Sequence, residues 1–286
     1  MIKVAFYGVR NPAAAHSAAF PSEESSMKKY IRFLLPFFLA AMLICSAVKV
    51  IQILLSYQEG KDSYAALDSY VSISQQPVPS EPVPEDPVPE EISPSKDPMV
   101  DFDQLSAINP DIVGWITIPG TDINYPVVQG PDNDYYLNHL FDGTVNAAGC
   151  IFLDADNAGD FTDAHSLIYG HHMKNGAMFA PLVNYRQASF YQEHPTAILV
   201  TRDSAYTIRF FSGYVCDDWS GSWKLDFGEG EFETWLTDII GRSCFPCQDL
   251  PQPQDQIVTL STCTYEFEDA KFVLHGYIEN EGSPSE

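Results

Sequence analysis

The chain has 286 residues, and its 39 acidic and 15 basic side chains give it a formal net charge of −24. Hydrophobic residues make up 45% of the chain, which is enough to build a packed core, so the composition excludes a wholly disordered protein. Nucleic-acid-binding proteins carry basic surfaces, and the acidic balance therefore argues against a nucleic-acid partner. It equally disfavours electrostatic binding to anionic lipid.

A segment near the N-terminus, residues 31–55, is predicted to be a single transmembrane anchor. It contains FLLPFFLAAMLICSAV, a run without charge, and its length is close to the ~20 apolar residues that cross the hydrocarbon core as a helix. Lys28, Lys29 and Arg32 lie at its start, so the positive-inside rule places residues 1–30 in the cytoplasm and the rest of the chain outside the cell. A cleaved signal peptide is the alternative, but its apolar core would be shorter, and no clear cleavage site follows the run.

The next segment, residues 56–100, is predicted to be an exported stalk. Residues 56–76 are polar with scattered apolar side chains, which is compatible with a short helix beyond the membrane. The sequence PVPSEPVPEDPVPEE follows, and its repeated Pro-Val-Pro with acidic spacers favours an extended polyproline II linker. A ligand for a proline-binding domain is the alternative, supported only by an isolated PxxP pattern.

The remaining chain is predicted to form one mainly β domain, residues 101–281, with a short tail at residues 282–286. The apolar spacing of Phe102, Leu105 and Ile108 predicts a short helix at its start. Short segments rich in Val, Ile and aromatic residues, separated by Gly, Pro, Asn and Asp, predict strands. These strands are expected at residues 115–118, 125–128, 150–153, 166–169, 197–201, 206–214, 257–261 and 272–277. With helices expected at residues 177–182 and 231–240, the pattern predicts a closed barrel with helical additions.

Most of the six cysteines show no pattern typical of a metal site. Cys244 and Cys247 form a CxxC pair, but a lone pair does not supply the four ligands of a structural zinc. A small disulfide and a redox role are the alternatives, with Cys216 as a third possible partner, and sequence alone does not decide the pairing. We therefore predict no metal and no cofactor.

A different cysteine, Cys263, lies where a predicted strand runs into a polar turn. Tyr169, Gly170, His171 and His172 follow the end of another predicted strand. A thiol nucleophile needs a base or an imidazolium to set its thiolate fraction and to protonate the leaving group. A cysteine and a histidine on two strand ends of one barrel can meet across its rim, although ordinary loop residues would give the same pattern.

The motifs at these strand ends resemble those of the sortase family. TLSTC at residues 259–263 and YGHHM at residues 169–173 carry the resemblance. The segment DIVGWITIPGTDINYPVVQGPDNDYYLNHLFDG at residues 111–143, with GCIFLD before the histidine motif, resembles the class B sortases in particular. The similarity covers residues 101–278. It implies an eight-stranded sortase-type β-barrel, with an N-terminal helix and a helix-bearing insertion, that acts as a membrane-anchored thiol transpeptidase with its catalytic domain outside the cell.

The resemblance also implies roles for individual residues. Cys263 matches the nucleophile that cleaves a C-terminal sorting signal of a secreted protein, and His171 matches the general acid and base. An acyl-thioester would form and pass to an amine of a cell-wall precursor or of a pilin, which makes a pilin-polymerising sortase one alternative. Ser261 and Thr262 are candidate donors to the substrate, and Tyr169 is a candidate lining residue.

One position departs from the family pattern. Sortases carry an arginine a few residues beyond the cysteine, and the matching residue here is Lys271. Lysine keeps the charge but lacks the planar fork of arginine. Lys271 is predicted to be a single cationic donor to the reacting carbonyl. The alternative is a catalytically silent, anchored binding module.

Overall fold

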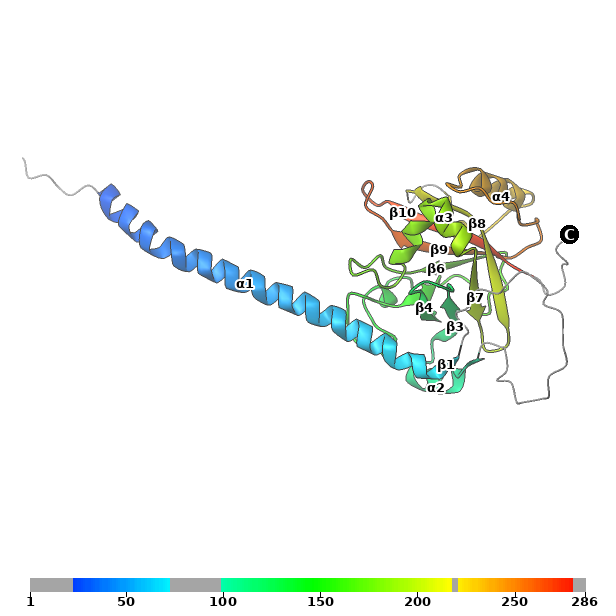
Figure 1. Ribbon diagram of the computed structural model, residues 1–286, viewed down its shortest axis with the longest axis horizontal. Helices are drawn as coiled ribbons and strands as arrows, with labels where there is room; N and C mark the ends of the chain where they lie inside the picture. Colours follow the sequence, from blue (N-terminus) through cyan, green and yellow to red (C-terminus); the bar gives the residue numbers. More distant parts are fainter. Residues whose placement is uncertain (1–22, 73–98, 218–220, 280–286) are drawn as a thin grey trace, which may run out of the picture. The chain divides into compact units, whose positions relative to one another are not determined.

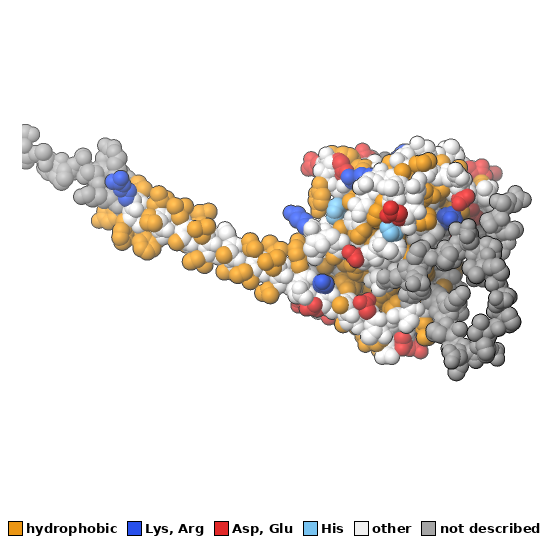
Figure 2. Space-filling view, viewed as in Figure 1, with side chains coloured by type: hydrophobic (Ala, Val, Ile, Leu, Met, Phe, Trp, Pro, Cys, Tyr) orange, Lys and Arg blue, Asp and Glu red, His pale blue; other side chains and the backbone are white. Residues whose placement is uncertain are grey.

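The computed structural model describes residues 23–72, 99–217 and 221–279 (Figure 1). The chain divides into two compact units between Ile53 and Leu54. Helix α1 (Glu23–Leu67) begins in the first unit and ends in the second. In the first unit its apolar side chains are exposed, and Figure 2 shows them along the visible face of the helix. By length and composition α1 can cross a membrane, and the predicted anchor lies within it.

In the second unit, the end of α1 packs against a β-barrel. Tyr64 and Leu67 are buried in the same core as the barrel, and the Tyr64 hydroxyl donates a hydrogen bond to the carbonyl of Gly149. After α1, β1 (Val71–Ser72) pairs with β2 (Met99–Val100). The first part of the predicted stalk therefore packs on the barrel, and the proline-rich part lies outside the described residues.

Eight strands form the closed barrel, as predicted. They are β3 (Ile112–Thr117), β4 (Asn124–Val128), β5 (Ile151–Leu153), β6 (His165–Tyr169), β7 (Thr196–Val200), β8 (Ala205–Cys216), β9 (Ile257–Cys263) and β10 (Lys271–Ile278). Their order around the barrel is β10-β8-β7-β3-β4-β5-β6-β9. Most neighbours are antiparallel, but β4–β5 and β6–β9 are parallel pairs.

The barrel strands are short and rich in branched and aromatic residues, which suits a surface buried on one or both faces. Among the largest fully buried side chains are Trp115, Ile116, Phe179, Phe210 and Phe272. They form one continuous core that also receives α2 (Phe102–Ile108), the short helix predicted from its apolar spacing.

The long insertion between β8 and β9 carries α4 (Glu231–Gly241), close to the predicted helix at residues 231–240. Its apolar face, with Trp235 and Ile239, packs with Phe211 and Val273 in a second buried cluster. The insertion is thereby fixed to β8 and β10. Two further short elements, η2 (Tyr135–Leu137) and α3 (Ala188–Glu193), connect barrel strands.

The predicted helix at residues 177–182 is confirmed only in its second half, and its start and its type are wrong. A 3₁₀ helix, η3 (Ala180–Arg186), begins three residues later. His172 forms an isolated β-bridge with Met178, whose backbone φ is 60°, and these contacts keep residues 177 and 178 in a loop. An apolar spacing typical of a helix is overridden here by backbone pairing within that loop.

Candidate functional site

The predicted site residues lie at one end of the barrel because of strand register. Strands β6 and β9 run parallel, with Tyr169 opposite Ser261, so both strands end at the same rim. Strand β10 runs antiparallel to β9 and begins with Lys271 directly opposite Cys263. Directly opposed residues have Cβ atoms about 5 Å apart on one face of the sheet. The register therefore places Cys263 and Lys271 side by side, with the His171 loop on the other flank of β9.

The nucleophile candidate is the exposed last residue of an otherwise buried strand. All residues of β9 before Cys263 are buried, and Cys263 itself is exposed with a free thiol. Its carbonyl oxygen accepts a hydrogen bond from Nδ1 of His172 at 2.9 Å. A rigid strand thus supports a thiol that solvent can reach, which is the combination that a nucleophile requires.

The two adjacent histidines make different contacts. His171 donates from Nε2 to the carbonyl of Leu137 at 2.6 Å, so its other ring nitrogen, Nδ1, takes no part in this contact. His172 holds the Cys263 carbonyl, and its ring lies 5.2 Å from that of Tyr265. The Tyr265 hydroxyl also donates to the His172 carbonyl. His172 therefore ties the histidine loop to the backbone of Cys263, whereas His171 is tied to η2 through the Leu137 carbonyl.

The histidine loop rests on β4. The amide of Phe179 donates to the His171 carbonyl at 2.9 Å, and the amide of Met178 donates to the Tyr125 hydroxyl at 3.1 Å. Tyr125 in turn meets the ring of Tyr64 edge-on, with centroids 5.2 Å apart. These contacts connect the loop to the barrel wall and to the end of α1.

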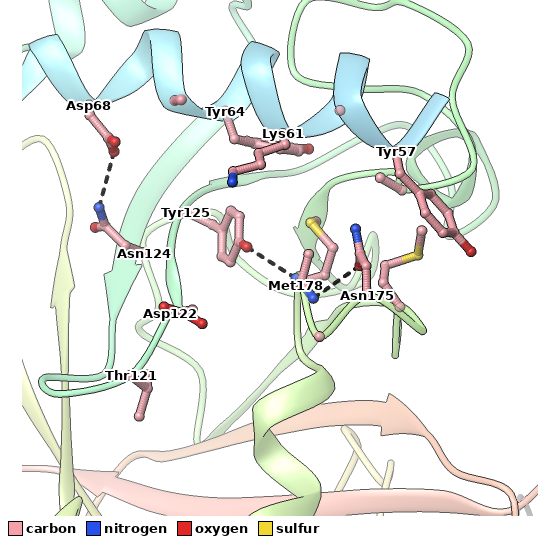
Figure 3. Close-up of a pocket in the computed structure, with 16 residues that line it drawn as sticks. Tyr57, Lys61, Tyr64, Asp68, Thr121, Asp122, Asn124, Tyr125, Asn175 and Met178 are labelled. Carbon is pink, nitrogen blue, oxygen red and sulfur yellow. Dashed lines mark hydrogen bonds between the residues drawn. The ribbon is translucent and has the colours of Figure 1, made fainter. Parts of the chain in front are cut away.

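A cavity of about 450 Å³ lies beside this loop. Figure 3 shows Tyr57 and Lys61 of α1 on one side of it, with Asp122 and Tyr125 on the other. Cys263 is not among the residues that line the cavity. The end of α1 and the histidine loop therefore line the same cavity, whereas Cys263 does not.

The three predicted substrate contacts have protein partners. The Thr262 hydroxyl donates to the carbonyl of Gly170 at 2.8 Å, and Ser261 accepts from the indole of Trp223 at 3.3 Å. The Tyr169 hydroxyl donates to Asp154 at 2.8 Å, and burial followed by the charge of Asp154 raises the pKa of this phenol. Each of the three is thereby held in place beside the site.

Lys271 lies between two cysteines in one cross-strand row. Cys263 is opposite it on β9, and Cys216 is opposite it on β8. Lys271 is half-buried, and its ammonium group donates to the carbonyl of Asp269 at 3.2 Å. The register thus places Lys271 opposite Cys263 on the neighbouring strand, with its ammonium group bound to the carbonyl of Asp269.

Two other histidines form a buried network behind the site. Thr259 of β9 bonds His165 of β6 and His275 of β10, each at 2.6 Å. His165 also donates to the carbonyl of Lys224 in the insertion at 2.8 Å, and His275 bonds Tyr214 of β8. Burial lowers the pKa of His165 to about 4 and that of His275 well below its ordinary value. The network holds the strands that carry the site, with both rings neutral.

Some residues of the site carried no signal in the sequence. The Leu137 carbonyl is a backbone group, and Arg186 lies 78 residues from its partner Thr264. Tyr265 follows the cysteine motif closely, so its nearness to the site was open to prediction, but its contact with His172 was not.

Elsewhere, Cys244 and Cys247 are both free thiols. Within the described ranges, no three His, Cys, Asp or Glu side chains gather as metal ligands.

Comparison with known proteins agrees with this geometry. The model of the Sortase domain family matches residues 116–278. Sortase B of Listeria monocytogenes is 37% identical over 175 residues, which cover 60% of this chain and 71% of the relative. Sortase B of Clostridium perfringens superposes with a TM-score of 0.60 at 32% identity, covering 63% of this chain and 100% of that chain. A Staphylococcus aureus sortase B–substrate complex superposes with a TM-score of 0.60 at 31% identity, covering 63% of this chain and 85% of that chain.

A closed eight-stranded barrel with a cysteine and a histidine on neighbouring strand ends is the sortase arrangement, and the chain belongs to the sortase family, whose members are cysteine transpeptidases. Within that family its relatives are sortases B, which places the chain in class B. The resemblance found in the motifs is thereby confirmed for fold and family.

Proposed function

We propose that this protein is a membrane-anchored sortase that cleaves a C-terminal sorting signal and transfers the remaining protein to an amine of the cell wall. The observation that carries the proposal is the exposed thiol of Cys263 at the end of β9, next to the histidine loop that ends the parallel strand β6. The S. aureus relative was solved with a substrate, which supports a substrate at this rim.

In the proposed reaction, the Cys263 thiol gives its proton to His171, and the resulting thiolate attacks a peptide carbonyl of the sorting signal. The C–N bond breaks, the leaving amine takes a proton from His171, and a thioester forms on Cys263. An incoming amine then gives a proton back to His171 and attacks the thioester, so that a new amide forms and the thiolate returns. Lys271 stabilises the oxyanion in both steps as a single cationic donor.

The exported position of the site follows from the proposed anchor. With residues 31–55 in the membrane and residues 1–30 in the cytoplasm, the barrel faces the outside, where sorting signals and wall precursors of a Gram-positive cell are found. The acceptor amine belongs to a wall precursor in this proposal. A pilin lysine as acceptor would make the enzyme a pilin polymerase.

The test is a peptide-library assay with the full chain in detergent. Wild-type protein should cleave a subset of peptides, and mass spectrometry should detect the acyl-enzyme on Cys263. C263A should abolish both signals because no other group replaces the nucleophile. C244A, which removes an exposed thiol elsewhere, is the matched control and should retain activity. Cleavage that persists in C263A would contradict the proposal.

A silent binding module is the second candidate, and the lysine at the family's arginine position favours it. A thiol probe separates the two. In an active enzyme Cys263 should react much faster than Cys244 and Cys247, because only Cys263 would have a general base, His171, to accept its proton. Equal labelling of the three, together with the absence of any acyl-enzyme, would favour the binding module.

A further inference from the structure

The arginine at the end of η3 binds the loop that follows the nucleophile. A terminal nitrogen of Arg186 donates to the Thr264 hydroxyl at 2.6 Å, and the other terminal nitrogen pairs with the carboxylate of Glu266. The Thr264 hydroxyl also donates to Glu266, which closes a three-member cluster. The guanidinium lies 5.7 Å from the ring centroid of Phe272, on β10. One side chain thus contacts the loop twice and the following strand once.

This loop connects two of the proposed catalytic residues. It leaves Cys263 at the end of β9 and reaches Lys271 at the start of β10, and its base is closed by a bond from the Thr264 amide to the Ala270 carbonyl at 2.8 Å. Between these points it is mostly solvent-exposed, with Tyr265 at 67% and Phe267 at 50% exposure. A loop with so little buried area needs polar contacts to hold one conformation.

We infer that Arg186 is a positioning residue for the transpeptidation. It holds Thr264 and Glu266 together and thereby fixes the loop that joins Cys263 at the end of β9 to Lys271 at the start of β10. A planar guanidinium can serve two acceptors at once, which an ammonium group on a flexible stem does not do with the same geometry. This inference rests on the proposed function of Cys263 and Lys271.

The chain offers a matched control at the opposite end of the barrel. Arg202, in the turn between β7 and β8, donates to Asp103 at 2.6 Å and to the Ser106 hydroxyl at 2.9 Å. Its guanidinium lies 5.8 Å from the ring centroid of Phe102. Arg202 therefore makes the same kinds of contact as Arg186, with a carboxylate, a hydroxyl and an aromatic ring, but remote from the thiol.

The experiment compares R186Q with R202Q in the full chain. Single-turnover acylation, measured over a range of peptide concentrations, separates the limiting rate from the half-saturating concentration. R186Q should lower the limiting rate about 10- to 100-fold, the loss expected when reacting groups are displaced by about 1 Å. R202Q should leave that rate unchanged, and both variants should shift the melting temperature by similar amounts. R186K should recover only part of the rate.

A double-variant cycle tests the route through Thr264. T264V should also lower the acylation rate, and adding it to R186Q should give little further loss, because the two substitutions remove the same contact. Wild-type acylation rates in R186Q, or losses that multiply in the double variant, would overturn the inference.

Hydrogen exchange distinguishes failure of this inference from failure of the proposed function. If wild-type protein forms no acyl-enzyme, the proposed function is wrong, but the amide exchange rate of the loop can still be measured in each variant. R186Q should speed amide exchange over residues 264–270 at least about tenfold relative to wild type, since local opening sets that rate. R202Q should not. Unchanged exchange in R186Q would overturn the inference.

Discussion

A cation opposite the thiol is the least conventional residue of this site. Lys271 pairs with Cys263 in the strand register, which is the position where an oxyanion donor is useful. Its single ammonium group offers donors without the fork of an arginine. In the proposed mechanism, stabilisation of the oxyanion at this position therefore depends on one charge and on how firmly that charge is held.

Substitution of Lys271 measures that dependence. K271A should lower kcat on the order of 100-fold, the loss seen when one oxyanion donor is removed, whereas K271R should hold or raise the rate. The measurement is the steady-state rate of transpeptidation with a peptide that the wild-type protein cleaves. K224A, which removes a paired lysine from the insertion, is the control. An unchanged kcat in K271A would show that the lysine is only a surface residue.

At this scale, Cys263 and His171 became candidates because each lies where a predicted strand runs into a polar turn, and the resemblance of TLSTC and YGHHM to sortase motifs supplied their roles. Strand ends are local features, so they are visible in a short window. Arg186 and the Leu137 carbonyl are not visible in this way, because only the folded barrel brings them to the rim. Long-range contacts of this kind need the register, which a single sequence does not provide.

The end of β6 depends on close packing as well as on hydrogen bonds. Gly170 lies just before the histidines, and a Cβ built on it would come 2.4 Å from Ile151 and 2.6 Å from the ring of Phe179. Phe179 donates its amide to His171, so these two features are coupled. The glycine of the YGHH motif is therefore explained by space rather than by an unusual backbone angle.

G170A should consequently disturb the histidine loop. We expect it to lower the free energy of unfolding by about 1–3 kcal/mol, as overpacking does in a dense core, and to reduce acylation because Phe179 must move. Urea unfolding and the acylation rate are the two measurements. G241A, where a Cβ meets nothing within 4 Å, is the matched control and should be close to neutral. Wild-type stability in G170A would contradict the packing argument.

The positions of the strands were predicted well, because short segments rich in branched and aromatic residues recur between turn residues. The position of the helix after the histidine loop was predicted poorly, because no such recurring pattern marks it. All eight barrel strands lie in segments rich in branched and aromatic residues, which are separated from one another by turn residues. The segment at residues 177–182 has an apolar spacing typical of a helix, but the bridge from His172 to Met178 prevents it from starting there. Local spacing predicts a helix only if no competing backbone pairing is available.

Two histidines that are buried and neutral inside the barrel, His165 and His275, make its stability depend on pH. The folded pKa of His165 is about 4, below its ordinary value of 6.5, so between these values the unfolded chain binds more protons. Stability is therefore complete above pH 6.5 and falls as the pH drops toward 4. His275 acts in the same direction.

Protein stability should follow this titration. Between pH 7.5 and pH 5, His165 alone should lower the free energy of unfolding by about 2 kcal/mol. Urea unfolding of the full chain at several pH values measures the slope. H165Q, which keeps hydrogen-bonding groups but does not titrate, should reduce the pH dependence in that range. An equal slope in wild type and H165Q would contradict the assignment.

At the scale of the whole chain, the boundary between stalk and barrel was the hardest feature to predict. Tyr64 and Leu67 lie in a mostly polar stretch, so their burial depends on partners such as Gly149 that are far away in sequence. The distribution of charge among the regions of the chain, in contrast, can be counted directly from the sequence. Residues 101–286 hold seven of the 15 basic side chains, and Arg186 and Lys271 are two of these seven.

The parallel pair β6–β9 also affects how the molecule folds. Gly170 and Thr262, which join the two strand ends, are 92 residues apart. Parallel strands cannot be joined by a hairpin, so the chain must close this long loop before the two ends meet, and such closure slows folding. During folding, the Cys263 thiol and the His171 imidazole therefore come together only when this long-range pair of strands forms. The candidate site is therefore assembled with a non-local pairing and not with the local strands that carry its residues.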